Sequence, residues 1–125
     1  MTGSRRGFTL VELLVVMAII ATLLTIAVPR YFLSLERSKE AVLRQDLATM
    51  RESIDRFYGD TGRYPQTLAE LVERRYLRAI PVDPMLRAAD KWVVVNAEDP
   101  DDEGVKDVRS GAEGAGENGV PYGAW

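Results

Sequence analysis

The sequence predicts an α+β protein, a lollipop in which one long N-terminal helix forms the stem and packs on a small antiparallel sheet. Three observations predict this fold. Residues 8–28 form an apolar run in which Glu12 alone is charged, an apolar stripe at helical spacing continues over residues 43–57, and two short β-rich segments follow. Because two strands alone are marginally stable in water, the sheet needs the helix behind it.

The apolar run from Phe8 to Val28 has the length of a membrane-spanning helix. It would extend ~30 Å at ~1.5 Å per residue, which matches the hydrocarbon core of a bilayer. A cleaved secretory signal would have a shorter apolar region ending in small residues, whereas this run is followed by Pro29 and Arg30. A plain anchor leaves Glu12 unexplained, since a carboxylate within a membrane helix costs ~2.5 kcal/mol or more.

The contiguous stretch Gly7-Phe8-Thr9-Leu10-Val11-Glu12 resembles the class III signal of type IV pilins and type II secretion pseudopilins. The resemblance implies that a prepilin peptidase cleaves between Gly7 and Phe8, and that the new N-terminal Phe8 is methylated. It also implies three parts of the chain: a leader peptide over residues 1–7, a transmembrane or filament-core helix over residues 8–29, and a periplasmic head over residues 30–125 that includes the amphipathic half of the helix and the sheet.

Two interpretations of Glu12 follow from its position after the cleavage site. Cleavage creates an α-amino group on Phe8, and the Glu12 carboxylate of a neighbouring subunit would compensate that charge and set the axial register of a filament. Removing one partner of such a buried pair is strongly destabilising. In the alternative interpretation, Glu12 only reaches back to the membrane interface near the start of the helix.

Charge and composition narrow the class of protein. The net charge is −3, and the chain has neither cysteine nor histidine. Disulfides, thiol chemistry, histidine zinc sites and histidine-based catalysis are thereby excluded. No nucleophile–base pair or phosphate-binding glycine loop is visible in the sequence, so no enzyme is predicted. The acidic balance argues against nucleic acid as a partner, since nucleic-acid binding needs a basic face.

The basic residues around the apolar run predict the membrane orientation. Arg5 and Arg6 precede it, and by the positive-inside rule they place the N-terminus in the cytoplasm. The head of this single-pass protein of the bacterial inner membrane is then periplasmic. After the run, residues 30–32 (Arg-Tyr-Phe) are typical of an interfacial anchor.

The long helix is expected to run from about Phe8 to Tyr58. Pro29 predicts a kink or local unwinding, and the turn residues 59–62 predict its end. Two i,i+4 pairs are expected on its solvated face, Glu40 with Arg44 and Glu52 with Arg56. The other face carries one apolar stripe at steps of three and four, formed by Leu43, Leu47, Met50, Ile54 and Phe57.

The remaining elements are short. Thr67-Leu68-Ala69-Glu70 is a capping box, which predicts a second helix from Leu68 to Arg75. Residues 91–96 and 105–109 are predicted strands, the second with Val105 and Val108 as its apolar positions. The acidic turn over residues 98–104 joins the two strands, and a glycine-rich loop begins at Ser110.

Later motifs are similar, as an ordered series, to the major pseudopilins of type II secretion, the general secretion pathway protein G family. They are Tyr64-Pro65, Tyr76-Leu77, Pro81-Val82-Asp83-Pro84, Lys91-Trp92, residues 107–114 and the terminal Trp125. The resemblance implies a structural subunit that joins minor pseudopilins on an inner-membrane assembly platform. The resulting homo-oligomeric filament is a periplasmic pseudopilus that drives export of folded proteins across the outer membrane. The alternative is a type IV pilin or minor pilin that serves adhesion, motility or DNA uptake.

Members of this family commonly hold a calcium ion in the C-terminal loop, so the resemblance also implies calcium as a cofactor. In this chain glutamate replaces the family's first aspartate, one residue is missing, and the later aspartate pair reads Glu-Asn. Calcium accepts roughly six to eight oxygen ligands in irregular geometry, which keeps a modified loop compatible with the ion. The predicted ligands are Ser110, Glu113, Glu117 and Asn118. In the alternative interpretation, packing of Tyr122 and Trp125 alone holds the loop, with its acids in water.

Overall fold

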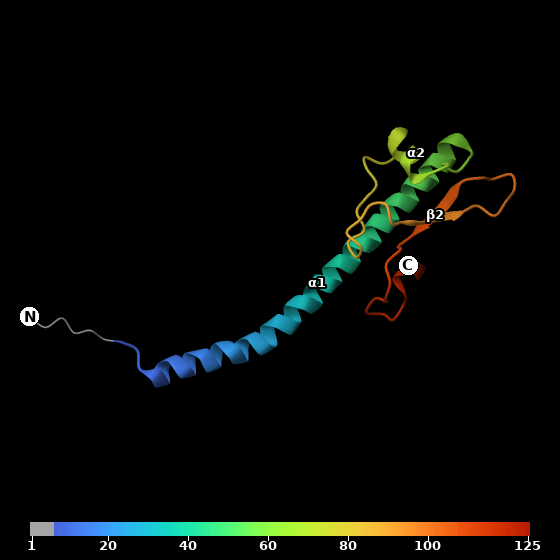
Figure 1. Ribbon diagram of the computed structural model, residues 1–125. Helices are drawn as coiled ribbons and strands as arrows, with labels where there is room; N and C mark the ends of the chain where they lie inside the picture. Colours follow the sequence, from blue (N-terminus) through green and yellow to red (C-terminus); the bar gives the residue numbers. More distant parts are fainter. Residues whose placement is uncertain (1–6) are drawn as a thin grey trace, which may run out of the picture. The chain divides into compact units, whose positions relative to one another are not determined.

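The computed structural model in Figure 1 describes residues 7–125. Apart from Gly7, the predicted leader lies outside these residues, and so do the two arginines on which the predicted orientation depends. Two compact units are present, one ending at Arg37 and one from Ser38 to Trp125. Helices and strands together confirm the α+β class. In chain order they are α1 (Leu10–Thr61), α2 (Leu68–Glu73), β1 (Val93–Asn96), β2 (Val105–Arg109) and the 3-10 helix η1 (Tyr122–Ala124).

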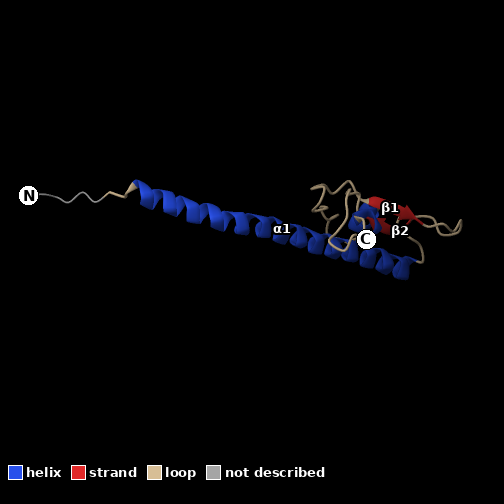
Figure 2. Cartoon of the chain, turned by 90° about the horizontal axis from the view of Figure 1, so that it is seen from below, coloured by secondary structure: helices blue, strands red, loops and turns tan. Residues whose placement is uncertain are grey.

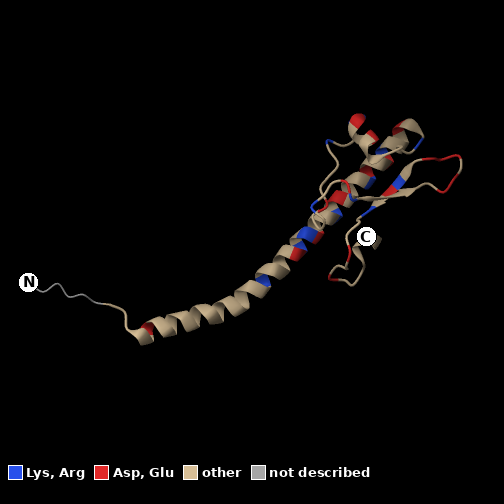
Figure 3. Cartoon of the chain, viewed as in Figure 1, with Lys and Arg blue, Asp and Glu red and all other residues tan. Residues whose placement is uncertain are grey.

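The N-terminal part of α1 is suited to an apolar surrounding. α1 contains an 18-residue stretch of mean hydropathy 2.7, of which 0% is buried, and is long and apolar enough to cross a membrane. In Figure 3 this part is uncharged apart from one acidic position at its start. The hydroxyls of Thr22 and Thr25 donate to carbonyls of their own helix at 2.8 and 2.6 Å, as polar groups in lipid require. The helix continues through Pro29, so the expected local unwinding is absent from the described chain there.

The C-terminal part of α1 carries the core of the head. All five residues of the predicted stripe are buried, each at most 2% exposed, which confirms the prediction. They pack with Leu71, Trp92, Val105 and Val108 from the elements that follow. Figure 2 shows β1 and β2 lying along this part of α1. Fully burying one such side chain contributes about 1.5–3 kcal/mol, so the helix is the support that the sheet lacks by itself.

One of the two predicted ion pairs on α1 forms and one does not. Arg56 and Glu52 pair at 3.6 Å. Glu40 is instead buried and accepts a hydrogen bond from the Tyr122 hydroxyl at 3.0 Å. The prediction of a Glu40–Arg44 pair was wrong because the C-terminal loop covers this part of the helix, which local spacing alone cannot reveal.

The end of α1 and the short α2 follow the expected turn chemistry. Gly62 has a φ of +74° and its N–H bonds to the Tyr58 carbonyl at 2.8 Å, a left-handed cap that suits glycine. Thr67 caps α2, with its side chain accepting from the Glu70 N–H at 3.3 Å. α2 ends at Glu73, earlier than predicted, because Arg75 adopts a φ of 64° and turns the chain out of the helix.

Within the described residues the sheet consists of β1 and β2, paired antiparallel from Val93 with Arg109 to Asn96 with Val105. A bulge leaves Lys106 without a partner on β1. Residues three apart in a regular strand face opposite sides, but the extra residue lets both Val105 and Val108 point into the core. β1 begins two residues later than predicted, because Trp92 is buried and its indole N–H bonds to the Pro81 carbonyl at 2.8 Å.

A pH-dependent contribution to stability is expected from Glu70. Arg63 donates two hydrogen bonds to its carboxylate, at 2.9 and 3.1 Å, and these, with the N–H of Gln66, lower the pKa of Glu70. A lowered carboxyl pKa stabilises the fold above the unfolded value of ~4.3, and the contribution is lost as the pH falls through the folded value. Glu70→Gln should therefore lower the thermal midpoint at neutral pH and lose this effect in acid.

The measurement is a series of circular-dichroism melts of wild type and Glu70→Gln from neutral pH down to ~2. Glu73→Gln, which changes an exposed carboxylate of the same helix, is the matched control. A Glu70→Gln deficit of the same size at both ends of the series would contradict the assigned role of the ion pair.

Candidate processing and assembly site

α1 begins with a capping box that is formed by Thr9 and Glu12. The Glu12 N–H donates to Thr9 Oγ1 at 3.1 Å, and the Thr9 N–H donates to Glu12 Oε2 at 3.1 Å. Two N–H groups that a helix start leaves without partners are thus satisfied by side chains of the same turn. Glu12 therefore has a role in its own helix that neither interpretation of the sequence included.

The signal for this box is present in the sequence. Thr9-x-x-Glu12 has the same pattern as Thr67-x-x-Glu70, which correctly predicted the start of α2. The box holds the Glu12 carboxylate against the N–H of Thr9, which directly follows Phe8. Its other oxygen, Oε1, has no hydrogen-bond donor within residues 7–125, and the side chain is exposed. A second cation or donor can therefore reach the carboxylate without breaking the cap.

The Gly7–Phe8 junction is open. Both residues are exposed and lie ahead of the helix, and the Phe8 side chain is 91% exposed. A β-carbon added to Gly7 would meet no atom within 4 Å. The fold itself thus sets no requirement for glycine at this position, and any such requirement comes from a partner that binds the junction.

Two of the four predicted calcium ligands are engaged in other contacts. Glu113 is exposed, and the carbonyl oxygen of the Asn118 side chain accepts the Val120 N–H at 3.1 Å. The Ser110 hydroxyl is buried and donates to Asp83 Oδ2 at 2.7 Å. Across residues 7–125 no group of three or more acidic, histidine or cysteine side chains is placed to hold a metal ion. Calcium binding thus remains a prediction, and the donor set offers no preformed cage.

Asp83 is a buried acid whose partner sequence reasoning missed. It is fully buried, its Oδ1 accepts the N–H groups of Met85 and Leu86, and its Oδ2 accepts the Ser110 hydroxyl. The Pro-Val-Asp-Pro motif at residues 81–84 marks the position, but the serine partner lies 27 residues away. This contact ties the loop after α2 to the first residue of the C-terminal loop.

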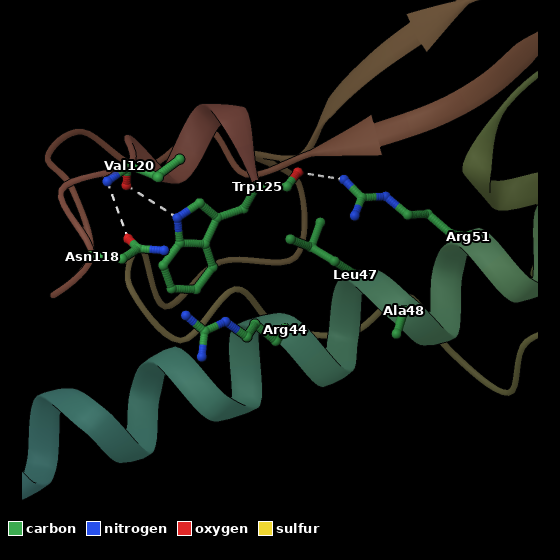
Figure 4. A pocket seen from close by; sticks show the side chains of 7 residues that line it. All are labelled: Arg44, Leu47, Ala48, Arg51, Asn118, Val120 and Trp125. Atoms are coloured by element: carbon green, nitrogen blue, oxygen red, sulfur yellow. Dashed lines mark hydrogen bonds between the residues drawn. The ribbon is translucent and has the colours of Figure 1, made fainter.

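A pocket of about 320 Å³ lies between α1 and the C-terminal loop, as Figure 4 shows. Arg44 places its guanidinium 4.5 Å from the centre of the Trp125 ring. Arg51 donates to Asp107 Oδ1 at 2.8 Å, to the Val108 carbonyl at 2.9 Å and to the main-chain oxygen of Trp125. Trp125 therefore rests on α1. The complete lining is Arg44, Leu47, Ala48, Arg51, Asn118, Val120 and Trp125.

An exposed glycine–phenylalanine junction precedes an apolar helix whose first turn holds a capped glutamate, and this arrangement is typical of proteins that are modified at the N-terminus. The family model for the prokaryotic N-terminal methylation motif matches residues 3–28. By relatives that match beyond this motif, the chain belongs to the family of the type II secretion system core protein G.

Three relatives illustrate the match. The type II secretion system core protein G of Escherichia coli (strain K12) is 29% identical over 125 residues, covering 87% of this chain and 82% of that protein. That of Klebsiella pneumoniae is 31% identical over 96 residues, covering 64% and 69%. The type IV major pilin protein PilA of Myxococcus xanthus (strain DK1622) is 35% identical over 66 residues, covering 53% of this chain but 30% of that pilin. No solved structure was found to match.

Proposed function

We propose that this protein is a structural subunit of a type II secretion pseudopilus. It is processed by a prepilin peptidase and assembles into a periplasmic filament that drives export of folded proteins across the outer membrane. The observation that carries the proposal is the start of α1, where an accessible Gly7–Phe8 junction and a capped Glu12 open an apolar helix. Membership of the core protein G family supports it.

The exposed apolar helix requires partners. None of its membrane-length stretch is buried within this chain, and side chains such as Leu10, Leu14 and Leu23 are at least 60% exposed. Such a continuous apolar surface is stable only in lipid or against other apolar helices. Lipid covers this apolar surface before assembly, and further copies of the same helix cover it in the filament.

The parts of the chain take matching roles in this proposal. Residues 1–7 are the leader, residues 8–29 form the membrane and filament-core helix, and residues 30–125 form the head. The N-terminus lies in the cytoplasm and the head in the periplasm, as Arg5 and Arg6 favour. Prepilin peptidase, minor pseudopilins and the inner-membrane assembly platform are the partners. The role is structural and needs no catalytic group.

A second candidate function is that of a type IV pilin or minor pilin. The 35% identity to the Myxococcus xanthus pilin over 66 residues favours it. The match covers a smaller share of both proteins than the match to the Escherichia coli core protein G. DNA uptake is disfavoured by the net charge of −3, since a DNA-binding head needs a basic, aromatic-bearing stripe.

Deletion of the gene distinguishes the two functions. We expect exoproteins to accumulate in the periplasm of the deletion strain and to be released again when the wild-type chain is supplied. Enzyme assays or immunoblots of periplasm and medium measure this, and a cytoplasmic marker controls for lysis. Normal secretion with loss of surface pili would overturn the proposal in favour of the pilin.

A further inference from the structure

We propose that side chains of α1, and not a calcium ion, hold the C-terminal loop of this chain in place. The loop is residues 110–125, and the contacts that hold it are called the α1 clasp: Glu40 with Tyr122, and Arg44 and Arg51 with Trp125. The order of the loop is then independent of calcium. The inference concerns the head alone and is separate from the role of the filament.

Two of the four predicted oxygen ligands, Ser110 and Asn118, are already engaged in other contacts. Calcium needs roughly six to eight oxygen ligands directed at one point. The Ser110 hydroxyl donates to the buried Asp83 and also accepts the Ala112 N–H at 3.1 Å. Moving Ser110 to an ion would remove one hydrogen bond from a fully buried carboxylate, which is costly. The glutamates in place of the family's aspartates do not compensate, since no three acids of the described chain lie close enough to share an ion.

The first contact of the clasp is a buried hydrogen bond. The Tyr122 hydroxyl donates to Glu40 Oε1 at 3.0 Å across 82 residues of sequence. Tyr122 is 8% exposed and Glu40 is 6% exposed, so water competes little for either group. A hydrogen bond to an ionised acceptor is roughly twice as strong as a neutral one. This contact fixes η1 on the first turns of the head's part of α1.

The second contact is made by the two arginines. Arg51 binds both ends of the segment, since it donates to the carbonyl of Val108 just before the loop and to the main-chain oxygen of Trp125. Arg44 lies over the face of the Trp125 ring, where the ring attracts a cation. The ring also packs edge-on against Tyr122 with centroids 5.0 Å apart. The two anchor residues of the loop thus support each other.

Between its anchors the loop closes on itself. Ala115 and Pro121 form an antiparallel bridge, and the Gly116 N–H bonds to the Val120 carbonyl at 3.0 Å. The Trp125 indole N–H bonds to the same Val120 carbonyl at 3.1 Å. A β-carbon on Gly116 would come within 2.4 Å of the Trp125 ring, so glycine is needed where the indole crosses the backbone. These contacts use only backbone and aromatic groups of the chain itself.

Hydrogen exchange of the full-length protein in detergent tests the inference. The rate is measured by mass spectrometry for peptides that cover residues 110–125, in excess calcium chloride and in excess chelator. We expect identical protection in the two conditions. Tyr122→Phe and Arg51→Ala should each speed exchange of the loop by about tenfold or more, the effect of losing a hydrogen bond to a charged group. Arg44→Ala should have a smaller effect in the same direction. Arg56→Ala, which removes an arginine of the same helix that pairs with Glu52, should have none.

Two results would overturn the inference. One is protection that rises with calcium and loses this rise in the double variant Glu113→Gln, Glu117→Gln. The other is loop exchange that stays unchanged in both Tyr122→Phe and Arg51→Ala. Tyr122→Phe removes a single oxygen atom, so it remains informative if Arg51→Ala disturbs β2 through the loss of its Asp107 ion pair at 2.8 Å.

Discussion

Gly7→Val is expected to leave the leader attached to essentially all of the protein and to abolish filament assembly. A β-carbon at Gly7 meets no atom within 4 Å, so the substitution leaves the fold unchanged. Its effect must then arise in the site of the peptidase, where a branched side chain blocks the close approach that glycine allows. Intact-mass analysis of membrane-extracted protein gives the answer, since the mature wild type should lack residues 1–7 and carry a methyl group on Phe8.

Gly59→Ala is the matched control for this experiment. Gly59 lies in α1, and an added β-carbon there also meets nothing within 4 Å. This variant should be processed normally and assemble. A wild-type protein whose mature mass still includes the leader would refute the cleavage site, and so would complete processing of Gly7→Val.

Glu12→Gln is expected to block filament assembly as strongly as Glu12→Ala while membrane insertion continues. Glutamine can replace glutamate at the N3 position of a capping box, so this variant keeps the helix start and removes only the charge. In the filament the α-amino group of Phe8 would then lack its counter-charge. An uncompensated buried charge costs about 3–5 kcal/mol, which corresponds to a loss of association of roughly a hundredfold or more.

Thr9→Ala separates the cap from the charge. It removes the hydroxyl that accepts the Glu12 N–H at 3.1 Å and retains the carboxylate. We expect a loss of about 1 kcal/mol at the helix start, with filaments still formed. Filament number and length are counted by electron microscopy, after mass analysis has established that each variant is processed. Wild-type filaments from Glu12→Gln, or equal defects in Glu12→Gln and Thr9→Ala, would refute the role of the charge and leave Glu12 as a cap.

The sequence predicts most of this fold because the signals are local and strong. The buried face of α1 follows from apolar residues at steps of three and four, and the start of α2 follows from one capping box. The strands are found at their predicted positions to within two residues. The bulge at Lys106 explains how Val105 and Val108 are both buried, which simple alternation does not predict.

The candidate site, too, could be predicted from the sequence only in part. The motif from Gly7 to Glu12 is contiguous, and the sequence contains the pattern of its capping box. The interpretation of Glu12 nevertheless considered only its charge and not its role as a cap. The hydrogen-bond partners that hold the C-terminal loop could not be predicted from the sequence. Glu40 has Arg44 four residues away, yet it pairs with Tyr122. Ser110 was assigned to an ion, yet it donates to Asp83.

The sequence by itself determined the apolar helix, its processing motif, the family and the face of α1 that is buried. Each of these depends on residues within a few turns of one another, where spacing and composition suffice. Only the tertiary structure decided the partners of Glu40, Arg51 and Ser110. These contacts join residues 27 to 82 positions apart, and a charged or hydroxyl group accepts many partners. Which partner it takes is set by how the C-terminal loop returns to α1, and that path depends on the packing of the whole head.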